Sequence, residues 1–138
     1  KITVFGGDQL RPNLHIQDYC DLECLLITAK AEKIKNQIFN VGYQNLSIND
    51  LALIVKKVVE SEFPEKGKIE IEKTTSDDNR SYHINSDKIN ELLGFKPKYT
   101  IEDAVKGLCD NFKNEKIKDS FNDDFYFNVK RLKRLGIK

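Results

Sequence analysis

The chain has 138 residues, of which 39% are hydrophobic and 33% charged, and its formal net charge is +1. This length and balance are typical of one soluble globular domain. A charge near zero provides no general field toward nucleic acid or an anionic membrane, so neither is expected as a partner. No apolar run approaches the roughly 20 residues that span a bilayer. No signal peptide is visible, which predicts a cytoplasmic protein, and the strand-like start "KITVF" without Met indicates a fragment.

The three cysteines are Cys20, Cys24 and Cys109, and an odd, sparse set of this kind indicates a reducing compartment. Cys20 and Cys24 are four residues apart, which places them one above the other on a helix. A zinc site would need two more ligands nearby, and His15 is the only other soft candidate. We therefore predict no metal site, and thiols that are buried or half-buried as small hydrophobes.

The first predicted element is a short strand over residues 2–5, followed by Gly6 and Gly7. A strand and a glycine turn also open dinucleotide-binding folds, but that turn needs three glycines in a G-x-G-x-x-G-like pattern that begins a helix. The next glycine is Gly42, and Pro12 would interrupt a helix that began here. The opening turn is therefore not predicted to bind a dinucleotide cofactor.

Two helices and a strand are predicted next. Apolar residues at helical spacing predict a helix over residues 18–33. Residues 37–42, a β-branched and aromatic run that ends in glycine, predict a buried strand. The helix over 47–60 should begin at Ser47, because Asp50 three residues later completes an arrangement close to a capping box.

A break at Pro64 separates these elements from the second half of the chain. Isoleucine alternates with charged residues over 68–73, which predicts an edge-like strand. A short helix is predicted over 86–95, with Ser86 as its N-cap and Gly94 at its end.

Two more helices complete the prediction. The helix over 100–112 begins at Thr100, with an acidic residue three positions on as a capping partner. A final helix is expected within 125–138. Its basic residues form either a nucleic-acid patch or a solvated face that the helix macrodipole favours, and we favour the solvated face. These residues are Lys130, Arg131, Lys133 and Arg134.

Four short motifs occur in an order that carries a family resemblance. They are "ITVFGGDQLRPNLHIQDY" (strand, glycine turn, Q-x-R and H-[IV]-x-D), "IFNVGYQNLSINDLA" (a Y/F-N-[VI]-G strand and a capped helix), "DDNRSYHINSDKINELLGFKP" (D-x-R-x-Y, a Ser–Lys helix and L-G-[FW]-x-P) and "TIEDAVKGL" (a last helix). On these motifs the chain resembles the C-terminal half of the extended short-chain dehydrogenase/reductase family, the NAD(P)-dependent nucleotide-sugar epimerases and dehydratases. The resemblance covers roughly residues 1–113 and leaves 114–138 as a C-terminal extension, expected to be helical.

The resemblance implies an α/β fold: a mainly helical substrate-binding lobe with short strands, some of which join the Rossmann sheet of the other half. It implies an isomerase or lyase that binds a nucleoside-diphosphate sugar and, in its complete form, NAD or NADP and a second copy of itself. The cofactor-binding glycine pattern and the catalytic Tyr-x-x-x-Lys pair precede the matched region in the family, so this chain is predicted to hold no catalytic or cofactor-binding residue of its own.

Five residues are predicted to bind the substrate. Arg11, in the matching Q-x-R, is the expected phosphate ligand, because a guanidinium pairs with phosphate oxygens bidentately. A surface arginine or a structural ion pair with Asp18 is the alternative. Asn40 matches an asparagine that lies near the substrate in relatives, with backbone capping as the alternative. Val4 and Phe5 match the strand that lines the nucleotide, with plain core as the alternative.

Arg80, in "DDNRSY", is the second phosphate candidate, and here the sequence departs from the family. Many members carry an R-P-G-D-like stretch just upstream, where this chain has Thr75, Ser76, Asp77 and Asp78. Acidic residues near a pyrophosphate are electrostatically unfavourable unless Arg80 or Lys73 neutralises them.

Two further features are interpreted as structural or accidental. His15 matches the H-[IV]-x-D histidine and is predicted to be structural. The string from Tyr126 to Lys130 fits Tyr-x-x-x-Lys but lies at the wrong end of the chain, so we predict that it is not catalytic. Two other functions remain open: a non-catalytic module that binds a sugar nucleotide or a protein, and a small nucleic-acid binder that uses the basic tail.

Overall fold

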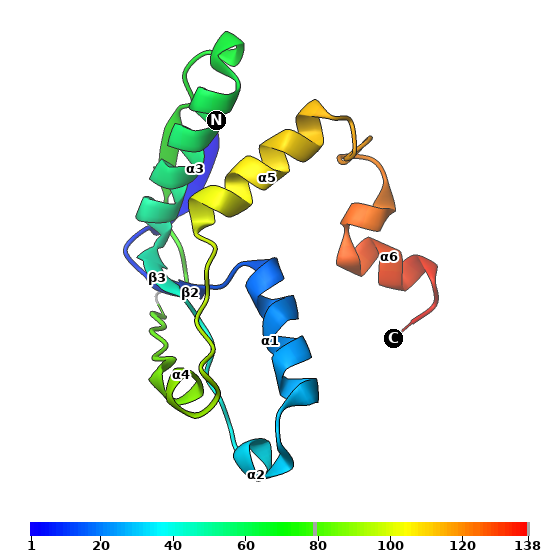
Figure 1. Ribbon diagram of the computed structural model, residues 1–138. Helices are drawn as coiled ribbons and strands as arrows, with labels where there is room; N and C mark the ends of the chain where they lie inside the picture. The colour runs from blue at the N-terminus through cyan, green and yellow to red at the C-terminus, as the bar shows by residue number, and fades with distance from the viewer. Residues whose placement is uncertain (79, 138) are drawn as a thin grey trace. The chain divides into compact units, whose positions relative to one another are not determined.

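The computed structural model describes residues 1–78 and 80–137. The chain forms two compact units, Lys1–Lys106 and Gly107–Lys138. The class is mixed α/β with more helix than strand, as predicted (Figure 1). Among the described residues, no helix is long and apolar enough to cross a membrane.

One pair of strands in the first unit is parallel. Strand β1 (Ile2–Phe5) pairs with β4 (Ile71–Thr74), so that Ile2 lies opposite Ile71. Helix α3 (Ile48–Glu62) packs along β1 (Figure 1). The first strand is confirmed as predicted, whereas the predicted strand over 68–73 begins three residues later.

The other pair is antiparallel: β2 (Leu10–Asn13) lies beside β3 (Gln44–Ser47), with Arg11 opposite Leu46. Pro12 is tolerated in β2 because each strand of a two-stranded sheet has a free edge. The predicted strand over 37–42 is wrong, since these residues are extended without a strand partner among the described residues and β3 begins after them. A β-prone sequence forms a strand only where a neighbouring strand pairs with it.

The predicted helix over 18–33 forms as two helices, α1 (Ile16–Thr28) and α2 (Ala31–Ile34). Ala29 ends α1 with an extended backbone, φ −70° and ψ 150°. Thr28 donates its hydroxyl back to the carbonyl of Cys24 at 2.9 Å, so the last turn of α1 is closed by a side chain. At the other end, the His15 ring accepts the backbone N–H of Gln17 and serves as the N-cap.

Helix caps were predicted well with one exception. Ser47 accepts the N–H of Asp50 at the start of α3, and Thr100 does the same for the acid three residues on at the start of α5 (Ile101–Lys113). Helix α4 (Asp87–Leu93) ends at Gly94, whose φ is +70°. Ser86 lies at the N-cap position of α4 as predicted, but its hydroxyl makes no cap bond and instead bonds both the N–H and the carbonyl of Gly42 at 2.9 Å.

The core of the first unit lies between α1 and α4, where two extended segments run between the two helices (Figure 1). Leu22, Ile89 and Phe95 form its centre. Partly buried side chains pack around them: Leu25, Leu26, Phe39, Val41 and Leu93. The 3-10 turn η1 (Pro64–Lys66) follows α3, as the predicted break requires.

The second unit contains the end of α5, the 3-10 turn η2 (Asp124–Tyr126) and α6 (Asn128–Arg134). Arg131 and Arg134 both pair with Asp124, so half of the basic face predicted in the tail is held in ion pairs. The final helix therefore exists but is shorter than its predicted range.

The expectation that all three thiols are buried or half-buried holds only for Cys109. Cys20 and Cys24 are exposed, because α1 turns Leu22, rather than these two residues, toward the core.

Candidate anion-binding site

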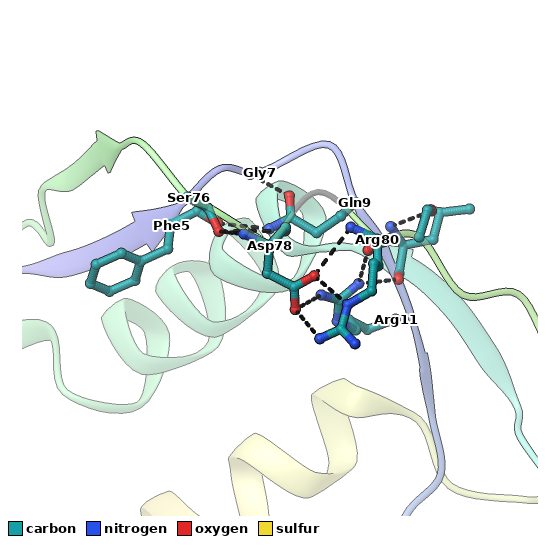
Figure 2. A network of polar contacts seen from close by, with 9 residues as sticks. Phe5, Gly7, Gln9, Arg11, Ser76, Asp78 and Arg80 are labelled. Carbon is teal, nitrogen blue, oxygen red and sulfur yellow. Dashed lines mark hydrogen bonds and ion pairs between the residues drawn. The ribbon is translucent and has the colours of Figure 1, made fainter.

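The glycine turn after β1 is closed by the side chain of Gln9 (Figure 2). The N–H of Gly7 donates to Gln9 Oε1 at 2.7 Å, and Gln9 Nε2 donates to the carbonyl of Phe5 at 2.8 Å. Gly6 and Gly7 have φ of +78° and +133°, a region that favours glycine. A Cβ on Gly6 would lie 2.8 Å from the Gln9 amide. The glycines thus make room for the chain's own side chains, which fix the direction in which β2 leaves the turn.

Arg11, on β2, is held by three oxygens. Its Nη1 donates to the carbonyls of Leu10 at 2.9 Å and Arg80 at 2.6 Å, and its Nη2 approaches Asp78 Oδ2 at 3.4 Å. The side chain is 26% exposed. The alternative of an ion pair with Asp18 is not the arrangement found, because the acidic partner is Asp78, 67 residues away in sequence.

Arg80 binds the same carboxylate from the other side. Its Nε and Nη2 donate to the two oxygens of Asp78 at 2.8 and 3.0 Å, and its backbone N–H donates to Oδ1 at 3.2 Å. Figure 2 shows both guanidinium groups converging on Asp78. The side-chain hydrogen bonds from Arg80 are the main cause that lowers the pKa of Asp78 to about 2, so this carboxyl is ionised at neutral pH.

Tyr82 completes this cluster. Its ring lies 5.2 Å from the guanidinium carbon of Arg11 and 5.9 Å from that of Arg80, within the range of cation–π attraction. The backbone N–H of Tyr82 donates to the carbonyl of Leu10 at 3.1 Å, and Ser81 Oγ accepts the N–H of Leu10 at 2.9 Å. These bonds bring Ser81 and Tyr82 alongside the start of β2.

The cluster of Arg11, Asp78, Arg80 and Tyr82 carries a formal charge of +1, from two guanidinium groups and one carboxylate. A guanidinium has five N–H donors, and only three of those of Arg11 have partners among the described residues. A recess of about 390 Å³, lined by Gly6, Asp8, Gln9 and Ser81, lies at the adjoining turn. The arrangement can therefore bind an anion next to an open surface.

The other predicted site residues lie apart from the guanidinium groups. Val4 is 2% exposed and belongs to the core, while Phe5 is 61% exposed and its ring points away from the cluster (Figure 2). The prediction that this strand lines a nucleotide therefore depends on Phe5. Asn40 is exposed in the extended segment before β3, and no contact joins it to either arginine among the described residues.

His15 lies where a structural role predicts it, with its ring 4.9 Å from that of Tyr99 and its Nδ1 occupied by the α1 cap. Tyr126 lies in η2, and Lys130 lies on α6 with its ammonium 4.4 Å from the ring centre of Phe127. No group of three potential metal ligands occurs within residues 1–78 and 80–137.

Sequence reasoning identified both arginines, and it named Arg80 or Lys73 as the residue that must neutralise the nearby acids. It did not predict the contact between Arg11 and Asp78 or the role of Tyr82. The signal was present in the D-x-R-x-Y spacing, which sets an acid and an aromatic residue two positions either side of Arg80. Gln9 was likewise visible in Q-x-R, but its role in closing the turn depends on the positive φ of the two glycines.

No protein-family model matches the chain. Among curated proteins, it is 28% identical over 111 residues to dTDP-glucose 4,6-dehydratase of Shigella flexneri, a match that covers 76% of this chain and 30% of that protein. The chain thus spans about a third of the length of the curated relatives it matches.

Solved structures with a similar fold include a threonine dehydrogenase, a nucleotide-sugar dehydratase and a nucleotide-sugar epimerase. L-threonine dehydrogenase from Phytophthora infestans has a TM-score of 0.66 at 11% identity, over 82% of this chain and 36% of that one. dTDP-glucose 4,6-dehydratase from Bacillus anthracis, in complex with NAD, gives 0.63 at 24%, over 84% and 36%. UDP-glucuronic acid 4-epimerase from Bacillus cereus, in complex with UDP-glucuronic acid and NAD, gives 0.62 at 20%, over 82% and 35%.

The fold is therefore that of the extended short-chain dehydrogenases/reductases, and the chain is similar to a part of these enzymes. The curated proteins it resembles in sequence are nucleotide-sugar dehydratases, and the solved structures it resembles include nucleotide-sugar epimerases.

Proposed function

We propose that the chain is the substrate-binding, C-terminal portion of an NAD(P)-dependent nucleotide-sugar dehydratase or epimerase, and that its cluster of Arg11, Asp78, Arg80 and Tyr82 receives the diphosphate. The single observation that carries the proposal is the meeting of Arg11 and Arg80, 69 residues apart in sequence, at one half-exposed position. The curated relatives support a ligand of this class, because dTDP-glucose contains a diphosphate between nucleoside and sugar.

Arg11 is the direct phosphate ligand in this proposal. Its contacts to two backbone carbonyls fix the side chain before a ligand arrives, so little rotational freedom is lost on binding. Charge-assisted bonds from its remaining N–H groups to phosphate would each contribute about 1.5–3 kcal/mol. Phe5, exposed on β1, and Asn40, exposed before β3, are proposed to contact the rest of the nucleotide.

The residues of this chain do not fit NAD(P). The glycine turn at Gly6 leads into a strand, β2, and not into a helix whose N-terminus could face a pyrophosphate. We therefore place the cofactor, whose chemistry is hydride transfer, in the part of the relatives that this chain does not cover. The contribution of this chain is to position the sugar, which lowers the entropic barrier of the reaction without moving a proton.

The proposal is tested by calorimetric titration of the protein with dTDP-glucose and with UDP-glucuronic acid. Arg11→Ala should weaken binding of the preferred ligand about ten- to a hundredfold, since it removes one charge-assisted contact. Arg11→Lys should recover only part of this loss, because lysine restores the charge but not the two-pronged guanidinium. In the complete enzyme, NAD(P) affinity should not change in either variant.

L-threonine serves as the control ligand, because threonine dehydrogenases share the fold and their substrate has no phosphate. Equal nucleotide-sugar affinity in all three proteins, or an affinity for L-threonine that depends on Arg11, would refute the assignment. Circular dichroism spectra should confirm that the variants are folded.

A further inference from the structure

The ion pair between Arg80 and Asp78 defines what Arg80 can contribute to the cluster. Two of its five N–H donors, Nε and one on Nη2, form the side edge of the guanidinium that binds carboxylates in parallel, and both point at Asp78. Arg80 is 73% exposed at its side chain, whereas Arg11 is 26% exposed. Arg80 is thus the more exposed of the two arginines and also the one with the shorter contacts to Asp78.

Asp78 lies between the two guanidinium groups and makes its shorter contacts with Arg80. The distance from Asp78 Oδ2 to Arg11 Nη2 is 3.4 Å, compared with 3.0 Å to Arg80 Nη2. If Arg80 were removed, Asp78 would have Arg11 as its only cationic partner among the described residues, and its negative charge would oppose any anion at Arg11. The same side-chain bonds raise the pKa of Arg80 and lower that of Asp78, in agreement with a tight pair.

We propose that Arg80 is a positioning residue which neutralises Asp78 and so keeps Arg11 available to an anion, rather than a direct ligand of that anion. The proposal rests on the function assigned above and refines the role of one residue in it. It also explains how an acidic residue can stand beside a phosphate site: the charge of Asp78 is cancelled locally by its neighbour two positions along the chain.

A double-mutant cycle with thymidine diphosphate as the probe tests this role. Arg80→Ala should weaken binding about tenfold, because it leaves the carboxylate of Asp78 beside the ligand with Arg11 as its remaining counter-charge. Asp78→Asn alone should tighten binding about threefold, since it adds one net positive charge to the cluster. The double variant Asp78→Asn/Arg80→Ala should return to within about twofold of wild type, because both charges of the pair are gone.

Two further variants sharpen the cycle. Arg80→Lys keeps the counter-charge without the fork, so its affinity should stay within about threefold of wild type. Asp77→Asn removes an adjacent, exposed carboxylate that has no contact with either arginine among the described residues, and it should leave affinity unchanged within about twofold.

The outcomes separate this inference from the function on which it rests. A double variant as weak as Arg80→Ala would make Arg80 a direct ligand and overturn the inference, as would an Arg80→Ala variant that binds like wild type. Loss of affinity in Asp78→Asn would overturn it too, by making the carboxylate necessary in itself. If Arg11→Ala binds thymidine diphosphate as well as wild type does, the proposed function fails, and the inference fails with it.

Discussion

Asp18 of α1 accepts a hydrogen bond from the backbone N–H of Tyr99, 81 residues later in the chain, at 3.0 Å. Its other oxygen accepts the N–H of Lys98 at 2.9 Å, and the side chain is 1% exposed. One buried carboxylate therefore ties the first helix to the segment that leads into α5. The sequence suggested Asp18 as a partner for Arg11, and not this link to the segment before α5.

Replacing Asp18 should destabilise the fold. In Asp18→Asn the amide NH₂ would face one of the two backbone donors, and an unsatisfied buried donor costs about 1–3 kcal/mol. The measurement is urea denaturation followed by circular dichroism. Asp21→Asn is the matched control, because Asp21 is half-exposed. Its contact with the Lys98 ammonium, at 3.7 Å, is also longer than the two hydrogen bonds of Asp18. Equal midpoints for the two variants would contradict the structural role of Asp18.

Gly7 should tolerate no side chain. A Cβ there would overlap the amide of Asn49, and the φ of +133° is strained for any other residue, so Gly7→Ala is expected to lower the free energy of unfolding by about 2 kcal/mol or more. Gly67 has a φ of +75° but nothing within 4 Å of its Cβ position. Gly67→Ala should therefore lose only about 1 kcal/mol, the cost of the backbone conformation. The comparison fails if both variants unfold at the same urea concentration.

The capping acid of α5 should make stability depend on pH. Bonds from the backbone N–H and hydroxyl of Thr100 lower the pKa of Asp103. A lowered folded-state pKa stabilises the protein above the unfolded value of about 3.9, and this contribution disappears as the pH falls through the folded-state pKa. The urea midpoint of Asp103→Asn should thus lie below that of wild type at neutral pH, and the gap should close in acid.

Tyr126 and Lys130 should prove dispensable for turnover. In the complete enzyme, Tyr126→Phe is expected to leave the rate of sugar-nucleotide conversion within a few-fold of wild type, because the string matches Tyr-x-x-x-Lys only by spacing. Loss of a true acid–base group would reduce the rate by roughly a thousandfold. Steady-state kinetics on Tyr126→Phe and Lys130→Gln decide the matter: a large and equal loss in both would mean that the pair is catalytic.

The features that sequence predicted best are those that depend on neighbours within a few residues. The caps at Ser47 and Thr100 and the left-handed end at Gly94 are local bonds or local backbone geometry, so their residue types suffice to find them. The hydroxyl of Ser86 was assigned to its own helix, but the fold presents it with Gly42, 44 residues away.

Long-range pairing limited the prediction of the site in the same way. Arg11 was identified from Q-x-R, and the local sequence offered Asp18 as its acid. The fold instead places Asp78 beside it, through the bonds that lay the segment from Arg80 to Tyr82 against Leu10. No periodicity or spacing near Arg11 carries that information, because the two segments meet only when β2 and its neighbours are assembled.

The extended segment from Phe39 to Val41 has a consequence for handling the molecule. Among the described residues, its backbone N–H and C=O groups bond to no other backbone group, and the adjacent Ile38 is 82% exposed. An unpaired, apolar edge of this kind is a template for strands of other molecules. A preparation of these 138 residues alone is therefore prone to self-association through this edge, at a rate that rises with protein concentration. A charged residue at Ile38, which faces outward, should slow that association without disturbing the core, because Phe39 and Val41 supply the inward packing.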